Sequence, residues 1–437
     1  MTPSFARAVE ELERLGQMPP PGRFRTDEME RALAALARPH EAYARAQVIG
    51  TNGKGSAALF LSAILGAHGL KTGLYTSPHL VSFRERIVLD GSAISERAFA
   101  SLYFSLKPVF IKFRLTQFER LTIMAAECFR REKVDFAVFE TGLGGKGDAV
   151  TSFKSPYLLF TTISMEHGDI LGKTIRLIAG AKAQPLEYCE RAWALEQASR
   201  TAADVLRKKA ASRGIPLAFL PLPNSAVIAH GGTSFVHRGR KYRIPMFGGQ
   251  YAANAALALE AASCIMGERF SSSKAAGGLS RVVWAGRLQF LHFKGCNPML
   301  VSCAHNDESL EADLAAIRRF MDIGLMPRKN IRVLFGVSGA RDTAKFIGKV
   351  RKVFGDVTLT AVPGHDAAFE RASGEKGISF CRDYRAAVRR IVGPRPENKC
   401  FAVVMGSIYL AGAALSLLTG GEVLPVKVSK QGGLRRG

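Results

Sequence analysis

Short apolar runs alternate with stretches of helical periodicity through the first part of the chain. The runs are rich in Val, Ile, Leu and Phe and end in Gly or polar residues, which is typical of buried strands. They predict strands over residues 46–49, 72–75, 136–140 and 158–163. Between the second and third runs, one helical face collects Phe118, Leu121, Ala125, Cys128 and Phe129. The alternation predicts a mostly parallel sheet with helices on its faces.

The pattern restarts after Trp284-Ala285-Gly286-Arg287. It predicts strands over residues 299–303, 331–336, 357–362 and 401–405. It also predicts one helix with an apolar stripe of Leu310, Leu314, Ile317 and Met321, and another over residues 407–418. A chain of 437 residues is too long for one typical domain. We therefore predict an α/β fold with a P-loop-type, parallel-sheet ATPase domain over residues 1–288. A smaller Rossmann-like α/β domain is predicted over residues 289–437.

A Gly-rich turn, residues 50–56, follows the first predicted strand and reads GTNGKGS. A helix is predicted directly after it, over residues 57–68. The bare N–H groups of such a turn and the positive end of the helix bind phosphate. Lys54 can reach the outer phosphates, and the Ser56 hydroxyl can bind magnesium. The spacing is not GxxxxGK[ST], because position 48 is Val and Gly55 separates Lys54 from Ser56. The turn is predicted to hold a nucleotide.

Polar residues follow three further predicted strands. Ser77 comes after the second strand, Glu140 ends the third, and His167 comes after the fourth. Open α/β sheets bind ligands at these strand ends, and a buried charge is costly unless it is paired or binds metal. Taken alone, Ser77 is more often only a turn residue, and Glu140 is equally well a plain strand-end carboxylate. The alternative for His167 is a histidine in a surface turn. Together with Ser56 they predict a magnesium site.

The bulk composition excludes several classes of protein. The chain is 47% hydrophobic, so it can form buried cores. Seven cysteines without a CxxC pair favour buried thiols in a reducing compartment over disulfides or a zinc site. The N-terminus lacks a signal-peptide core, and no run approaches the roughly 18 apolar residues of a membrane span. We expect a cytoplasmic protein with no membrane partner.

The charge is strongly positive, with 61 Lys and Arg against 37 Asp and Glu, a net charge of +24. Such an excess attracts polyanions. It is spread along the chain, apart from a small cluster at Lys427, Lys430, Arg435 and Arg436. No helix–turn–helix, RRM or zinc-finger pattern accompanies it. We expect a diffusely basic surface and no nucleic-acid partner.

The combined motifs resemble those of the folylpolyglutamate synthase / dihydrofolate synthase branch of the Mur ligase family. The match runs through GTNGKGS, GLYTSPHLVSFRERI, FETGLGGKGDA, ISMEHGDILGKT, GQYAANAALAL, AGRLQ and GSIYLAG, in the family's order. GTNGKGS followed shortly by YTSPHL is far more specific than a bare phosphate loop.

The resemblance implies ATP-dependent joining of L-glutamate to dihydropteroate or a (tetrahydro)folate. The acid would become an acyl phosphate, and the glutamate amine would displace phosphate, releasing ADP and phosphate. The implied cofactors are ATP and Mg²⁺, with a monovalent cation as an option. The implied partners are these small molecules alone, bound to a monomer.

The resemblance also implies roles for individual residues. Residues that match ATP-binding positions are Asn52, Gly53, Lys54, Gly55, Ser56, Asn254, Arg287 and Ser302. Residues that match the magnesium ligands are Ser56, Ser77, Glu140 and His167. Lys182 matches the family's carbamylated lysine, whose carbamate serves a second metal, and His305 lies in the motif where the C-terminal domain closes on ATP. With Lys54, these two are the implied catalytic residues.

Several positions depart from the family pattern. The Asp of D-x-A-H-N is Ser302, which alters a nucleotide contact. The family's lysine motif, E-K-A-G, is replaced by AKAQ over residues 181–184, and its D-H pair is replaced by Glu166-His167. The family's L-D-A-T-N is replaced by GDAVT over residues 147–151, and its H-Q pair by Gly249-Gln250. If the change at 302 is a loss, Ser302→Asp should raise ATP affinity.

Two alternatives remain open. One is a Mur-type ligase acting on another carboxylate, although YTSPHL is a feature of the folate branch. The other is a homologue that binds nucleotide or nucleic acid but has no ligase activity. The altered motif positions and the basic composition favour this alternative.

Overall fold

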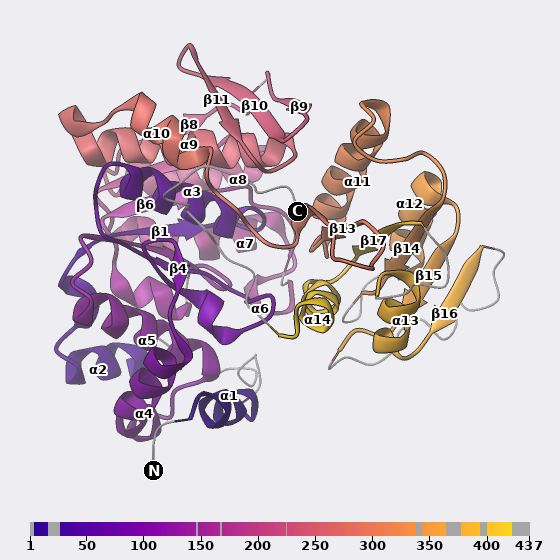
Figure 1. The fold of residues 1–437 in the computed structure, drawn as a ribbon. Helices are drawn as coiled ribbons and strands as arrows, with labels where there is room; N and C mark the ends of the chain where they lie inside the picture. The colour runs from indigo at the N-terminus through magenta and orange to yellow at the C-terminus, as the bar shows by residue number, and fades with distance from the viewer. Residues whose placement is uncertain are drawn as a thin grey trace.

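The computed structural model describes residues 4–15, 27–145, 147–166, 168–223, 225–337, 343–363, 377–393 and 400–421. His167 and the terminal basic cluster lie outside these ranges. The described chain forms a larger N-terminal part and a smaller C-terminal part that lie side by side (Figure 1). No described helix is both long and apolar enough to cross a bilayer.

The N-terminal part is organised by an eight-stranded sheet of order β4-β3-β2-β5-β1-β6-β7-β8. Its strands are β1 (Ala44–Ile49), β2 (Thr72–Tyr75), β3 (Ile87–Leu89), β4 (Ser92–Ala93), β5 (Phe136–Glu140), β6 (Tyr157–Phe160), β7 (Arg191–Leu195) and β8 (Leu217–Leu220). The six strands from β2 to β8 in that order run parallel, and β3 and β4 form an antiparallel edge. β1 lies between β5 and β6, so the turn after β1 is flanked by the ends of both.

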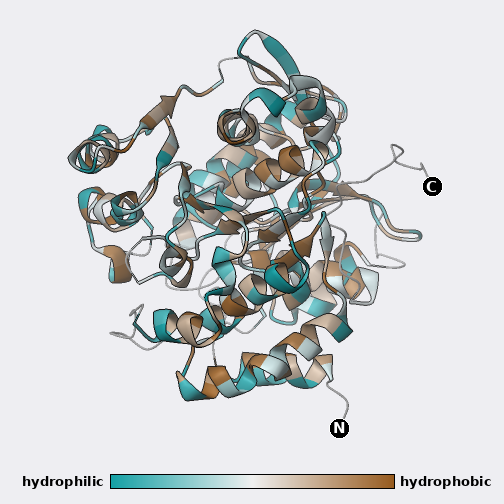
Figure 2. Ribbon diagram, turned by 90° about the vertical axis from the view of Figure 1, so that its left-hand side faces the viewer, coloured by the Kyte–Doolittle hydropathy of each residue, from teal (hydrophilic) through white to brown (hydrophobic). Residues whose placement is uncertain are grey.

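Helices cover both faces of this sheet, which explains why its central strands are apolar throughout rather than alternating. The helices of this part are α1 (Phe5–Glu13), α2 (Asp27–Ala35), α3 (Lys54–Ala67), α4 (Glu96–Lys112), α5 (Gln117–Arg131), α6 (Gly168–Leu171), α7 (Ile175–Lys182), α8 (Arg200–Ser212), α9 (Gly249–Met266) and α10 (Ser272–Leu279). Val138 packs with α3 and α9 on one face, whereas Phe139 packs with α4 and α5 on the other. The strands in the interior of the molecule are mostly hydrophobic, and the outer helices mix both kinds of residue (Figure 2).

Two further sheets complete the fold. A small antiparallel sheet holds β9 (Val227–Ala229), β10 (Gly232–His237) and β11 (Arg240–Ile244). The C-terminal part has a six-stranded sheet of order β12-β13-β17-β14-β15-β16. Its elements are β12 (Arg287–Leu291), β13 (Met299–Ser302), α11 (Asp307–Asp322), β14 (Ile331–Phe335), α12 (Thr343–Phe354), β15 (Val357–Thr360), β16 (Ile378–Cys381), α13 (Tyr384–Ile391), β17 (Phe401–Met405) and α14 (Ile408–Thr419). Only β12 runs antiparallel to its neighbour, and helices again cover both faces.

All eight predicted strands are present, and the α/β fold class is confirmed. The strand predicted over 158–163 ends at Phe160, because the chain then turns to the loop after β1, where Thr51 N–H bonds the Thr162 carbonyl at 2.7 Å. The helix predicted from residue 57 begins at Lys54, since Gly53, at φ 82°, is its N-cap. The boundary near residue 288 stays a prediction. The N-terminal helices end with α10 at Leu279, and the third sheet begins at Arg287.

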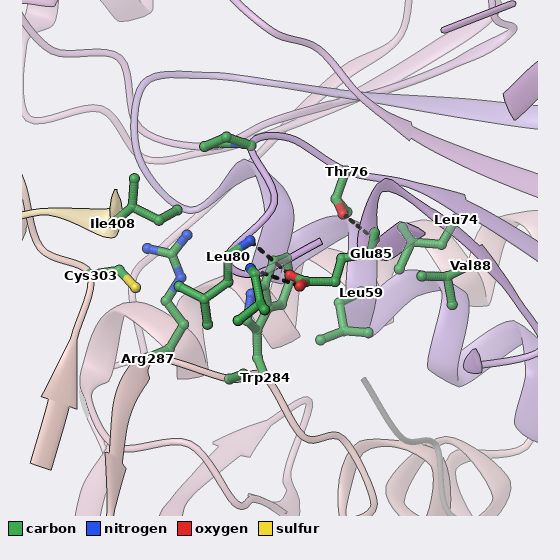
Figure 3. A pocket seen from close by; sticks show the side chains of 13 residues that line it. Leu59, Leu74, Thr76, Leu80, Glu85, Val88, Trp284, Arg287, Cys303 and Ile408 are labelled. Atoms are coloured by element: carbon green, nitrogen blue, oxygen red, sulfur yellow. Dashed lines mark hydrogen bonds between the residues drawn. The ribbon is translucent and has the colours of Figure 1, made fainter. Parts of the chain in front are cut away.

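The two parts meet around the segment that joins them. A small void of about 30 Å³ lies there, lined by the loop after β2, by Trp284 and Arg287, and by Cys303 and Ile408 of the C-terminal part (Figure 3). Beside it the Glu85 carboxylate accepts backbone N–H bonds from Leu80, Val81 and Ser82 at 2.7–2.8 Å. These bonds fix the loop that carries Ser77. α14 packs against the same loop, and a Cβ at Gly412 would lie 1.9 Å from the Leu80 carbonyl oxygen.

Candidate functional site

The turn after β1 presents unbonded backbone N–H groups at the start of α3. The first turn of a helix leaves its N–H groups without intrahelical acceptors, and here those groups belong to Lys54, Gly55 and Ser56. The Lys54 ammonium folds back to the Thr51 carbonyl at 3.0 Å. The loop therefore offers an anion both oriented N–H groups and a cation.

Two glycines of this turn sit where no other residue fits. Gly53 has φ 82°, and a Cβ there would lie 2.4 Å from the Asn254 amide nitrogen. A Cβ at Gly55 would lie 2.5 Å from the Trp284 ring. The turn is thus packed between α9 and the connecting segment, which explains its small residues.

Asn254, which the family resemblance assigns to ATP binding, lies against the same turn. It comes from α9, is buried, and its amide nitrogen donates to Ser56 Oγ at 2.8 Å. Ser56 Oγ in turn donates to the Gly53 carbonyl at 3.0 Å. A residue far along the chain thereby orients the hydroxyl predicted to bind magnesium.

Glu140 ends β5 beside this turn and is only 5% exposed. Its Oε2 accepts the Ser77 N–H at 2.9 Å and would lie 3.0 Å from a Cβ at Gly55. Burial raises the pKa of the Glu140 carboxyl, and the nearby Lys54 ammonium opposes that rise. A buried carboxylate with one backbone donor and a cation close by is a suitable metal ligand.

The oxygen atoms of Ser56, Ser77 and Glu140 thus lie along one cleft, which fits the preference of Mg²⁺ for few protein ligands, all oxygen. Within the described residues, no group of three or more His, Cys, Asp or Glu side chains forms a metal cage. His167, the fourth predicted ligand, lies outside them, so its assignment stays a prediction.

Lys182 ends α7 and reaches the underside of the turn. It is 1% exposed, and its ammonium donates to the carbonyls of Gly50 at 2.8 Å and Leu143 at 2.5 Å. Burial, reinforced by Lys54, lowers the Lys182 pKa to about 7. Apart from the family resemblance, nothing in the sequence distinguishes this lysine from a surface lysine. The structure places it between the Gly-rich turn and the glycine-rich segment after β5.

Asp148 organises that glycine-rich segment. Its carboxylate accepts the N–H groups of Leu143, Gly144 and Val150 at 2.8–2.9 Å. Burial raises its pKa, and the three N–H donors oppose the shift. A Cβ at Gly145 would lie 1.8 Å from the Ala181 carbonyl, so the segment also packs directly on the lysine helix.

The opposite side of the cleft is built by the C-terminal part, from β13 and the start of α11. His305 Nδ1 lies 3.0 Å from the Cys303 carbonyl, and its Nε2 lies 3.8 Å from Glu166 Oε1 of the N-terminal part. Asn306 caps α11, and its amide nitrogen donates to Asn52 Oδ1 at 2.8 Å.

Glu308, the second residue of α11, strengthens this bridge. Its Oε2 accepts from Asn52 Nδ2 and Ser164 Oγ, both at 2.8 Å. We call the contacts of Asn306 and Glu308 with Asn52 and Ser164 the interdomain bridge. The Asn52 side chain, predicted to contact ATP, is therefore bonded across the cleft here.

Ser302 ends β13 and is fully buried. Its hydroxyl donates to Asp313 Oδ2 at 2.5 Å and accepts the Ala304 N–H at 3.1 Å. Asp313 is not among the site residues predicted from the sequence. A signal was present, because Asp313 interrupts the apolar stripe formed by Leu310, Leu314 and Ile317 on α11, where a carboxylate is unexpected.

One cavity of about 1100 Å³ connects these residues. Its first side, the phosphate wall, contains residues 53–56, Ser77 and Glu140. Its second side, the helix wall, contains Ala304, His305 and the inner face of α11 with Asp313. Arg287 lies between them, with its guanidinium 5.9 Å from the Trp284 ring centre. A volume of this size is at the upper end of ordinary ligand sites and can hold more than one substrate.

The chain is similar in sequence to curated folate enzymes. It is 28% identical over 413 residues to a folylpolyglutamate synthase of Lacticaseibacillus casei, which covers 89% of this chain and 93% of that one. It is 32% identical over 304 residues to a dihydrofolate synthase/folylpolyglutamate synthase of Bacillus subtilis, which covers 65% and 69%. No protein-family model matches the chain.

The fold is similar to solved structures across almost its whole length. A structure of Mycobacterium tuberculosis folylpolyglutamate synthase complexed with ADP and AMPPCP matches with a TM-score of 0.82 at 25% identity. The match covers 96% of this chain and 100% of that one.

Proposed function

Because this chain belongs to the folylpolyglutamate synthase / dihydrofolate synthase family of Mur-type ligases, we propose that it joins L-glutamate to a pteroate or folate carboxylate with ATP. The observation that carries the proposal is the phosphate wall facing the helix wall across a single cavity of about 1100 Å³. The complex of the M. tuberculosis relative with ADP and AMPPCP supports nucleotide binding by a protein of this fold.

In the first step, a carboxylate oxygen of the pteroate or folate attacks the γ-phosphorus of ATP. The bond to the bridging oxygen breaks, ADP leaves, and an acyl phosphate forms. Both reactants are anions, so the step needs positive charge where they meet. The N–H groups of residues 54–56 and the Lys54 ammonium supply it. When bound, Mg²⁺ would neutralise phosphate charge beside Ser56, Ser77 and Glu140.

In the second step, the amine of L-glutamate attacks the acyl carbon. The tetrahedral intermediate expels inorganic phosphate, the amine nitrogen loses a proton, and an amide remains. Holding acid, ATP and amine together makes a large contribution to such a rate. His305 and Arg287 face the cavity from the helix wall and the connecting segment, where they can position these groups.

Lys182 and the metal ligands complete the proposal. A neutral amine is the form that reacts with CO₂, and a pKa of about 7 gives Lys182 a large neutral fraction at neutral pH. We propose that a Lys182 carbamate is compatible with this site despite the altered neighbours at 181–184. We also propose His167 as a further metal ligand, on the resemblance alone.

A coupled ADP-release assay tests the function. Dihydropteroate and tetrahydrofolate are supplied separately, each with and without L-glutamate, and the product is identified by mass. ADP is expected only when an acceptor and glutamate are both present, with a product heavier by one glutamyl residue. Nucleotide binding without glutamylated product from either acceptor would refute the function and favour a nonligating homologue.

A further inference from the structure

Asp313 is a buried carboxylate in the cleft wall that neither the family motifs nor the proposed mechanism uses. It is 6% exposed and lines the large cavity together with Tyr251 and Arg287. Burying a carboxylate among Leu310, Leu314 and Ile317 is costly, so its retention needs a polar partner.

The partners in the protein account for only part of its bonding capacity. Asp313 Oδ2 accepts the Ser302 hydroxyl at 2.5 Å. The Arg287 guanidinium is close enough to favour its charged form, although no salt bridge joins them. Within the described residues, Oδ1 has no hydrogen-bond donor, and the side chain borders the cavity. One carboxylate oxygen is thus available to a bound molecule.

We propose that Asp313 binds the nucleoside portion of ATP, supplying from helix α11 the carboxylate that the D-x-A-H-N motif supplies from the strand end. The inference rests on the proposed function for the identity of the nucleotide. A carboxylate repels phosphate, so the group that it binds is a neutral hydrogen-bond donor. On ATP such donors are the ribose hydroxyls and the adenine amine.

If Asp313 supplies the carboxylate, the expected effect of Ser302→Asp on nucleotide affinity is reversed. The Ser302 hydroxyl already lies 2.5 Å from Asp313, so an aspartate at 302 would bring two carboxylates together. Like charges this close disfavour each other. Ser302→Asp alone is therefore expected to weaken nucleotide binding rather than raise it. It should restore binding only when Asp313 is removed at the same time.

The test is ADP affinity by calorimetry in the full-length protein. Asp313→Leu is expected to weaken ADP binding about 10- to 100-fold, as for loss of a hydrogen bond to a charged group. The double variant Ser302→Asp/Asp313→Leu is expected to return to within about threefold of the unsubstituted protein. Asp322→Leu, which removes an exposed carboxylate from the same helix, is the matched control and should leave affinity unchanged. Unchanged affinity in Asp313→Leu, or a double variant no better than Asp313→Leu, would overturn the proposal.

Analogues identify the donor and exclude a purely structural role. 2′-Deoxy-ADP and 3′-deoxy-ADP each lack one ribose hydroxyl, and IDP lacks the adenine amine. In the unsubstituted protein, the analogue that lacks the group donating to Asp313 should bind more weakly than ADP. In Asp313→Leu the same analogue should bind as ADP does. Equal losses for every analogue in both proteins would mean that Asp313 only supports packing. If Asp313→Leu does not fold, Asp313→Asn serves, because it keeps the size and removes the charge.

This experiment separates the inference from the proposed function. ADP binding requires neither folate nor glutamate, so a protein that shows the Asp313 effects without ligase product would refute only the function. If the protein has ligase activity but Asp313→Leu does not change its ADP affinity, only the inference is refuted. Failure of the unsubstituted protein to bind ADP would overturn both.

Discussion

On the phosphate wall, Ser77 and Glu140 are placed by strand ends and joined by a backbone hydrogen bond, whereas on the helix wall the groups that face the cavity depend on α11 and its cap. The first arrangement ties each side chain to the main chain of a rigid parallel sheet. The second allows a carboxylate to move from a strand end to a neighbouring helix position and still border the same cavity. The two walls therefore tolerate sequence change differently.

The largest expected effect comes from the phosphate wall. Lys54→Met removes the cation, and Glu140→Gln removes the buried negative oxygen, so each should lower turnover at least ~100-fold. The readout is ADP release with acceptor and glutamate present. Lys71→Met removes an exposed lysine paired with Glu132 and should be neutral. Wild-type turnover in either site variant would show that this wall does not bind the reacting phosphates.

A substitution at Lys182 tests whether this buried lysine, beneath the Gly-rich turn, also contributes to turnover. Lys182→Met should lower turnover about 10- to 100-fold, as for loss of a group that supports a metal site. With ¹³CO₂ near pH 8, the unsubstituted protein should show a carbamate carbon signal in NMR that the variant lacks. Identical spectra would leave Lys182 as an ammonium that ties Gly50 to Leu143.

Asp313 provides a test of the helix wall through pH. Burial raises its pKa to about 6 from the usual 3.8, so the folded state favours the protonated form. The stability that this group contributes is present below about pH 4 and is lost as the pH rises to about 6. Relative to the unsubstituted protein, Asp313→Asn should gain about 1–3 kcal/mol in free energy of unfolding between pH 4 and pH 7. Denaturant unfolding at both pH values measures it, and no change in the difference would contradict the burial argument.

The smallest effect is expected from the interdomain bridge. Glu308→Ala removes the acceptor of both the Asn52 and Ser164 bonds, which are exposed to solvent. Each such exposed bond contributes about 0.5–1 kcal/mol, so losing both should lower the population of the closed arrangement roughly tenfold. Small-angle scattering without nucleotide should show a larger radius of gyration. Glu311→Ala, on the outer side of the bridge and paired with Lys349, is the control. An unchanged radius would mean that the bridge does not hold the two parts together.

The sequence predicted the phosphate wall better than the helix wall for a physical reason. Lys54, Ser77 and Glu140 follow apolar runs, and the ends of neighbouring parallel strands must meet at one sheet edge. The α/β class followed from the same runs. β7 and β8 were missed because they contain Ala and no β-branched residue, and β12 because it begins within the connecting segment.

The helix wall could not be predicted from motif positions alone. At position 302 the sequence indicates a lost carboxylate, while the compensating carboxylate, Asp313, lies in the following helix, α11. Only the fold brings Ser302 and Asp313 together. Asn52 shows the same limit on the phosphate wall, because its side chain bonds to Asn306 and Glu308 of the C-terminal part, which no motif position indicates.

Both walls are expected to act on one nucleotide, and a crystal structure with a nonhydrolysable ATP analogue tests this most directly. We expect the analogue's terminal phosphates within hydrogen-bond distance of the N–H groups of residues 54–56. We also expect a ribose hydroxyl or the adenine amine within that distance of Asp313 Oδ1. An analogue that contacts only one wall, or that binds outside the cavity between them, would contradict the account.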